Sequence, residues 1–149
     1  MKNTTIIIAS DHRGVVLKQI LIQYLRTLNI NTLNLGPNSS EEKADYPIIV
    51  TQTVKKILTK EATYGILICN TGIGMSIAAN RFKGIRAALC HNPECASLAK
   101  KHNDANIIVF GGGYITPEAA KLSITAFLES HFEKGRHEDR IKMIENIEK

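Results

Sequence analysis

Short apolar runs alternate along the chain with longer stretches in which apolar residues recur at helical spacing. The runs are rich in β-branched residues, which is typical of strands buried on both faces of a sheet. They predict five strands, at residues 5–10, 30–35, 64–69, 85–89 and 106–110. Apolar residues three or four apart indicate amphipathic helices. The predicted helices span residues 14–28, 48–58, 75–81, 93–101, 119–131 and 138 to the C-terminus.

Strands that alternate with helices are joined by right-handed crossovers, which produce a parallel sheet. The predicted fold class is therefore α/β, a Rossmann-like three-layer sandwich with a five-stranded parallel sheet. The composition is even over residues 1–149, which favours a single domain. The last helix lies beyond the final strand and carries a narrow apolar stripe of Ile141, Ile144 and Ile147. We expect it to pack on a partner subunit in a homodimer, with a tetramer as the alternative.

Composition and charge argue against several classes of protein. A hydrophobic content of 44% and a charged content of 22% are typical of a soluble globular protein. No signal peptide or membrane-spanning run is present, so we expect a cytoplasmic protein without a membrane partner. The net charge of +5 comes mainly from scattered lysines, which does not indicate nucleic-acid binding. Cys69, Cys90 and Cys95 are too few and too irregular for a disulfide framework or a Cys-x-x-Cys metal site.

Ligands of an open parallel sheet bind beyond the carboxyl ends of its strands. Asp11 and His12 follow the first predicted strand, Cys69 ends the third, and residues 111–113 follow the fifth. Residues 70–74 form a glycine-containing turn whose N–H groups could bind an anion at the start of a helix. Glycine also serves packing in such turns, so the turn alone gives roughly even odds for either role.

Two residues of this edge have a structural alternative to a catalytic role. A thiol at the N-terminus of a helix is stabilised as the reactive thiolate, which would make Cys69 a base. The alternative for Cys69 is a small buried apolar side chain. Asp11 could act on a substrate, or it could cap the helix that follows it.

Two motifs in the second half of the chain are equally ambiguous. His102 and Asn103 could take part in proton transfer, or they could simply end a helix. Arg136 and Arg140 are four residues apart and share one face if that segment is helical. Such a pair could bind a phosphate or could remain solvated, and the second outcome is the commoner one on a surface helix.

Taken together and in this order, the motifs resemble the type B ribose-5-phosphate isomerases over nearly the whole chain. Five segments carry the resemblance: DHRG at 11–14, ADYP at 44–47, ILICNTGIGMSIAANRFKGIRAA at 66–88, KHNDANIIVFGGG at 101–113 and GRHEDR at 135–140. The resemblance implies an aldose–ketose isomerase of the non-oxidative pentose phosphate pathway. Such an enzyme interconverts D-ribose 5-phosphate and D-ribulose 5-phosphate, and it requires neither metal nor cofactor.

The resemblance also implies roles for individual residues. His102 would open the furanose ring, and Cys69 would then move a proton between C2 and C1 through a cis-enediolate. Thr71 would help to stabilise the enediolate, and Asp11 would bind or deprotonate the O1 and O2 hydroxyls. The implied substrate contacts are Asp11, His12, Tyr46, Asn70, Thr71, Gly72, Ile73, Gly74, Asn103, Arg136 and Arg140. Two subunits share each site in this family, so His102 and Asn103 would face the partner's cysteine turn.

Two positions bear on the branch of the family and on its substrate. Some relatives use a Glu of the glycine turn as base, whereas this chain has Met75 there and keeps Cys69. Many relatives carry a phosphate-binding Arg after the fifth strand, whereas this chain has Gly113. Allose 6-phosphate is therefore an alternative substrate. A non-catalytic phosphosugar-binding sensor is the alternative from another class, and an aromatic content of 5% disfavours a flavodoxin-like electron carrier.

Overall fold

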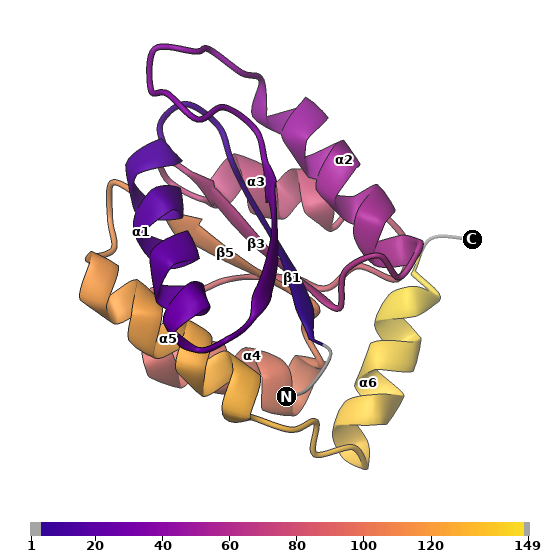
Figure 1. Ribbon diagram of the computed structural model, residues 1–149. Helices are drawn as coiled ribbons and strands as arrows, with labels where there is room; N and C mark the ends of the chain where they lie inside the picture. Colours follow the sequence, from indigo (N-terminus) through magenta and orange to yellow (C-terminus); the bar gives the residue numbers. More distant parts are fainter. Residues whose placement is uncertain (1–3, 148–149) are drawn as a thin grey trace.

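The computed structural model describes residues 4–147 (Figure 1). The strands are β1 (Thr5–Ser10), β2 (Asn31–Leu35), β3 (Tyr64–Cys69), β4 (Ala87–Leu89) and β5 (Ile107–Gly111). The helices are α1 (Val15–Thr27), α2 (Tyr46–Leu58), α3 (Ile73–Ala79), α4 (Pro93–Asn103), α5 (Pro117–Glu129) and α6 (Arg136–Glu145). Each of these elements corresponds to one that the hydrophobic pattern predicts.

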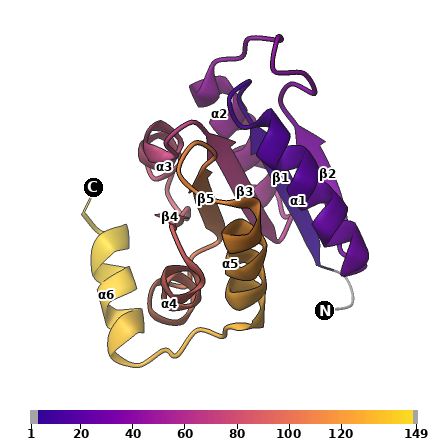
Figure 2. The same cartoon turned by 90° about the vertical axis from the view of Figure 1, so that its left-hand side faces the viewer.

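The five strands form one parallel sheet in the order β2-β1-β3-β5-β4. Helices α1, α4 and α5 cover one face and α2 and α3 cover the other, as Figure 2 shows nearly edge-on. The predicted three-layer α/β sandwich is therefore confirmed. The central strands β1, β3 and β5 are almost wholly buried, which explains why their sequences are apolar runs without alternation. In the described part of the chain, no helix is long and apolar enough to cross a membrane; the cytoplasmic location stays a prediction.

Two element boundaries differ from the prediction in ways that matter for function. Helix α3 begins at Ile73 rather than at residue 75, because Gly72 adopts a left-handed conformation (φ 76°) that ends the turn early. Helix α6 begins at Arg136 rather than at residue 138, so the arginine already belongs to the helix. The helix was predicted to continue to the C-terminus, but it ends at Glu145, and residues 146–147 are not helical; residues 148–149 lie outside the described residues.

Helix α6 lies apart from the sheet and packs beside α4 (Figure 2). Of its predicted apolar stripe, Ile141 is buried within the chain itself, whereas Ile144 and Ile147 remain 52% and 76% exposed. Packing of this helix on a partner subunit stays a prediction.

Candidate functional site

The turn after β3 holds the Cys69 thiol against a backbone N–H group. Cys69 ends the strand and is only 6% exposed, and its Sγ accepts a hydrogen bond from the backbone N–H of Gly72 at 3.2 Å. Only glycine fits at position 72, because a Cβ there would lie 2.5 Å from Leu89 Cδ1 in addition to the left-handed φ. An N–H donor at the start of a helix stabilises a thiolate. This turn therefore has the geometry that a cysteine base requires.

The glycine run after β5 packs directly on this turn. The N–H of Gly112 donates to the carbonyl of Cys69 at 2.7 Å, and the N–H of Gly113 donates to that of Asn70 at 3.0 Å. At Gly111, a Cβ would lie 2.6 Å from the Thr71 carbonyl oxygen. The close approach of two backbones thus explains the glycine at 111, and the two N–H donors attach this run to the cysteine turn.

The turn after β1 brings Asp11 and His12 to the same edge. The Asp11 N–H donates to the carbonyl of Ile68, the residue before the cysteine, at 3.2 Å. Asp11 is buried, and its Oδ1 accepts hydrogen bonds from the N–H groups of Arg13 (2.9 Å) and Gly14 (3.1 Å). Asp11 therefore binds the backbone that leads into α1, as the structural alternative predicted. Its second oxygen, Oδ2, has no hydrogen bond to any described residue. The Nδ1 atom of His12 is buried and has no partner among these residues; a bound ligand would supply one.

Tyr46 joins the edge from the start of α2. Its ring lies over Gly74, where an added Cβ would be 2.8 Å from the tyrosine Cζ. The loop that leads to Tyr46 is anchored by the fully buried Lys18, whose Nζ donates to the carbonyls of Leu35 (2.8 Å) and Pro37 (2.7 Å). Burial lowers the pKa of Lys18, and the nearby carboxylate of Glu42 opposes that shift.

The predicted residues of the second half of the chain lie at the opposite edge of the sheet. Helix α4 runs back from its first residue near the carboxyl edge to Asn103 near the amino edge, and eleven residues span about 16 Å. The guanidinium of Arg86, just before β4, donates through Nε to the carbonyls of Asn103 and Asp104, both at 3.0 Å. His102 and Asn103 therefore lie where β4 and β5 begin. One chain does not bring them to Cys69.

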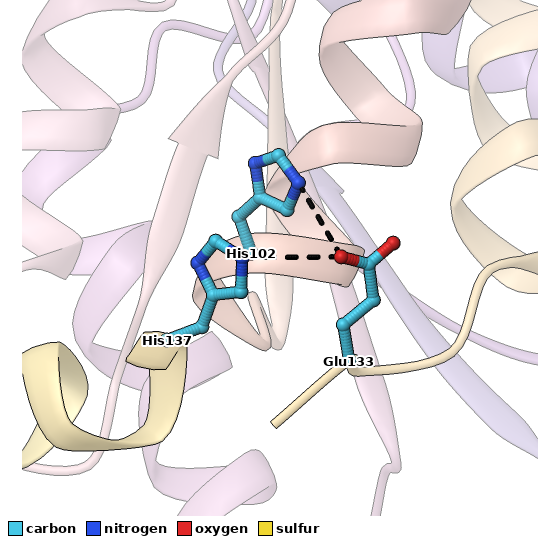
Figure 3. A group of neighbouring side chains, drawn as sticks. All are labelled: His102, Glu133 and His137. Carbon is cyan, nitrogen blue, oxygen red and sulfur yellow. Dashed lines mark ion pairs between the residues drawn. The ribbon is translucent and has the colours of Figure 1, made fainter. Parts of the chain in front are cut away.

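At this amino edge, His102 belongs to a cluster with two residues that the sequence analysis did not select (Figure 3). Glu133 Oε2 lies 3.6 Å from His102 Nε2 and 3.8 Å from His137 Nε2. The two imidazoles stack with their centroids 4.3 Å apart and their planes 6° from parallel. Burial lowers the pKa of His137, and the cationic forms of His102, Arg136 and Arg140 lower it further, whereas Glu133 opposes them. The spacing of four between Glu133 and His137 was the available sequence signal.

Two imidazoles and a carboxylate are a ligand set that zinc uses. Here the three ligand atoms lie within 4.8 Å of one another. However, an imidazole binds a metal in the plane of its ring, and two nearly parallel, stacked planes do not meet at one ion. The cluster is therefore arranged for contact between the rings rather than for chelation.

Comparisons with known proteins identify the family of the chain. The family model described as Ribose/Galactose Isomerase matches residues 6–144. Ribose-5-phosphate isomerase B of Escherichia coli (strain K12) is 41% identical over 138 residues, covering 93% of this chain and 92% of that protein. The crystal structure of a ribose 5-phosphate isomerase from Thermotoga maritima is 47% identical, with a TM-score of 0.94 over 97% of this chain and 99% of the other.

A third relative has been solved with a ligand. Ribose-5-phosphate isomerase B from Mycoplasma genitalium with bound ribulose-5-phosphate is 37% identical, with a TM-score of 0.91 over 97% of this chain and 96% of the other. A match of fold and sequence over almost the full length of each protein is far more specific than a shared architecture alone. The chain therefore belongs to the ribose/galactose isomerase family, and it is an isomerase.

Proposed function

We propose that this chain interconverts D-ribose 5-phosphate and D-ribulose 5-phosphate, with Cys69 as the base that moves the proton. The observation that carries the proposal is the Cys69 thiol, fixed at the carboxyl edge with Sγ 3.2 Å from the Gly72 nitrogen. Relatives named ribose-5-phosphate isomerase B support the choice of substrate.

The chemistry follows from the residues around the thiol. The Cys69 thiolate removes the proton from C2 of the open aldose and returns it to C1, so that atoms and charge balance over the cycle. The intermediate is a cis-enediolate whose negative charge needs donors. The N–H groups of residues 71–74, at the start of α3, would stabilise that charge; those of Gly72 and Ile73 donate to Cys69 Sγ and Thr71 Oγ1 within the chain itself. Asp11 would bind the O1 and O2 hydroxyls through its remaining oxygen.

The residues at the amino edge complete the site only if a second copy supplies them. His102 would open the furanose ring, and Asn103 would contact the sugar. The guanidinium groups of Arg136 and Arg140, both exposed, suit a phosphate dianion, with His12 as a further contact. Since α4 separates these side chains from the thiol of the same chain, we propose a homodimer in which each site takes residues from both subunits.

The test compares Cys69→Ser with wild type in the conversion of ribose 5-phosphate to ribulose 5-phosphate by chelator-treated protein. Loss of the base should lower kcat by about 10³-fold, since general acid–base catalysis contributes about 10²- to 10⁴-fold. Substrate binding, measured by calorimetry, should persist. Cys95→Ser is the control for the substitution itself, because Cys95 is a free cysteine away from the turn. A Cys69→Ser protein with full turnover would refute the cysteine base, and a wild type that binds without turnover would favour the sensor.

Allose 6-phosphate is a second candidate substrate because of Gly113. This residue is exposed, and its position offers no cation to a phosphate. An added Cβ would lie 2.8 Å from Asn70 Oδ1, the end of a side chain that can turn away. Gly113→Arg should therefore raise kcat/KM for ribose 5-phosphate relative to allose 6-phosphate. An unchanged ratio between the two substrates would show that position 113 does not select sugar length.

A further inference from the structure

Backbone contacts fix Glu133 next to His102. The N–H of Glu133 donates to the carbonyl of Lys101, the residue before His102, at 3.0 Å. Lys134 and Gly135 both have positive φ (59°), so the chain turns sharply there and α6 starts at once. The backbone of Glu133 is therefore held at the end of α4, which keeps its half-exposed carboxylate within reach of His102.

The same turn limits how the His102 ring can move. It brings the buried His137 ring onto one face of His102, at a centroid distance of 4.3 Å. The Glu133 carboxylate lies at the edge of the ring, 3.6 Å from Nε2, while the other nitrogen, Nδ1, points away from it (Figure 3). The imidazole thus has one contact on its face and one ion-pair contact at its edge, and together they favour this orientation of the ring.

The charges around the cluster favour pairing of Glu133 with His102 over pairing with His137. Burial and the cations of His102, Arg136 and Arg140 lower the pKa of His137. When His137 is neutral, the Glu133 carboxylate has no ion pair with it and can pair with His102 instead. A carboxylate that accepts a proton from one nitrogen of an imidazole fixes which nitrogen serves the substrate.

We propose that Glu133 is a positioning residue that keeps a proton on Nε2 of His102 and thereby makes Nδ1 the nitrogen that opens the sugar ring. The inference rests on the proposed function. The imidazolium of His102 gives its Nδ1 proton to the ring oxygen while the bond between C1 and that oxygen breaks. The C1 hydroxyl passes its proton to water, and C1 becomes the aldehyde carbon. His102 is left neutral, with its remaining proton beside Glu133.

The experiment measures the tautomer of His102 and the kinetics in the same full-length proteins. ¹⁵N NMR of histidine-labelled protein, with His102 assigned through His102→Asn, reports which nitrogen carries the proton. The variants are Glu133→Gln, which removes the charge at nearly constant shape, and Glu133→Asp, which keeps it. Glu129→Gln is the matched control, because Glu129 is also an exposed carboxylate, at the end of α5.

In the wild type, neutral His102 should carry its proton on Nε2. In Glu133→Gln, the Nδ1–H form should become substantial and kcat should fall by about 10-fold, as for other residues that orient a functional histidine. KM should change by less than about twofold, because the phosphate contacts are intact. Glu133→Asp should recover the Nε2–H form and most of kcat, and Glu129→Gln should match wild type in both measurements.

Three results would overturn the inference. One is an unchanged His102 tautomer in Glu133→Gln, and another is a changed tautomer with unaltered kcat. The third is a fall in KM at constant kcat, which would assign Glu133 to the electrostatics of the phosphate arginines. A wild-type chain without isomerase activity would refute the proposed function and the catalytic role with it. The tautomer measurement would still decide whether Glu133 orients His102.

Discussion

The two edges of the sheet carry different kinds of candidate functional residue. At the carboxyl edge, Cys69 is 6% exposed, and close packing at Gly72 and Gly111 leaves no room for an added Cβ. At the amino edge, Arg136 and Arg140 are exposed on a helix that lies apart from the sheet. Proton transfer at carbon tolerates little displacement of the base, whereas a phosphate can be bound by cations that settle when the partners meet. The more tightly packed of the two edges is therefore the one that holds the proposed base.

Alanine substitutions at two positive-φ glycines test this difference most severely. Gly72→Ala should destabilise the protein by about 3 kcal/mol, since it combines backbone strain with overpacking against Leu89. Gly135→Ala at the amino edge should cost about 1 kcal/mol, because only strain remains where no atom lies within 4 Å of the added Cβ. Urea unfolding of both variants measures the difference. Equal losses would show that the cysteine turn is no more tightly packed than the start of α6.

The exposed arginines should affect binding more than chemistry. Arg136→Ala should raise KM for ribose 5-phosphate by about 10-fold or more, because each hydrogen bond to a charged group contributes about 1.5–3 kcal/mol. The change in kcat should be smaller, since the phosphate is remote from the reacting carbons. Arg26→Ala is the control, because Arg26 is exposed on α1 and bonds only weakly to Gln23. A KM unchanged from wild type would refute the phosphate assignment of Arg136.

The smallest expected effect is a pH dependence of stability from His137. Burial and neighbouring cations lower the pKa of His137 in the folded chain below the ordinary value of 6.5. Between these two values the unfolded chain binds more protons than the folded one, so stability rises with pH in that window and is lost on acidification. His137→Asn should weaken this dependence in thermal unfolding from pH 5 to 8, and the exposed His131→Asn should not. An identical acid sensitivity in all three proteins would contradict the assignment.

Periodicity was enough to predict the elements, and the family motifs were enough to select the residues of the carboxyl edge. The start of α3 was misplaced because the pattern of apolar residues does not reveal the left-handed Gly72 that ends the turn. The glycines at 111–113 were noted for their place after the fifth strand and for a missing arginine, yet Gly111 is required by its close contact with the backbone of Thr71. The need for glycine at 111 comes from the turn after β3, which is about 40 residues away in sequence, so the local pattern around residue 111 does not reveal it.

The amino-edge cluster was missed for a related reason. Glu133 precedes the predicted last helix, and nothing in its sequence surroundings shows which residue its carboxylate contacts. The turn at Lys134 and Gly135 brings it against His102 at the end of α4. His137 was not selected, although its neighbour in sequence, Arg136, was, because paired arginines suggest phosphate binding. Sequence motifs identify residues that touch a ligand more readily than residues that orient them, because the latter depend on the packing of whole elements.

The direction of α4 has a genetic consequence. Under the shared-site proposal, a chain that lacks Cys69 still lends its His102 to a neighbour, and a chain that lacks His102 still lends its thiol. Two inactive variants, Cys69→Ser and His102→Ala, would therefore repair each other in mixed dimers, which contain one intact site and one doubly defective site. Random mixing of equal amounts should restore about a quarter of the wild-type rate. Mutations at the two edges of this sheet would behave as two complementation groups within a single gene.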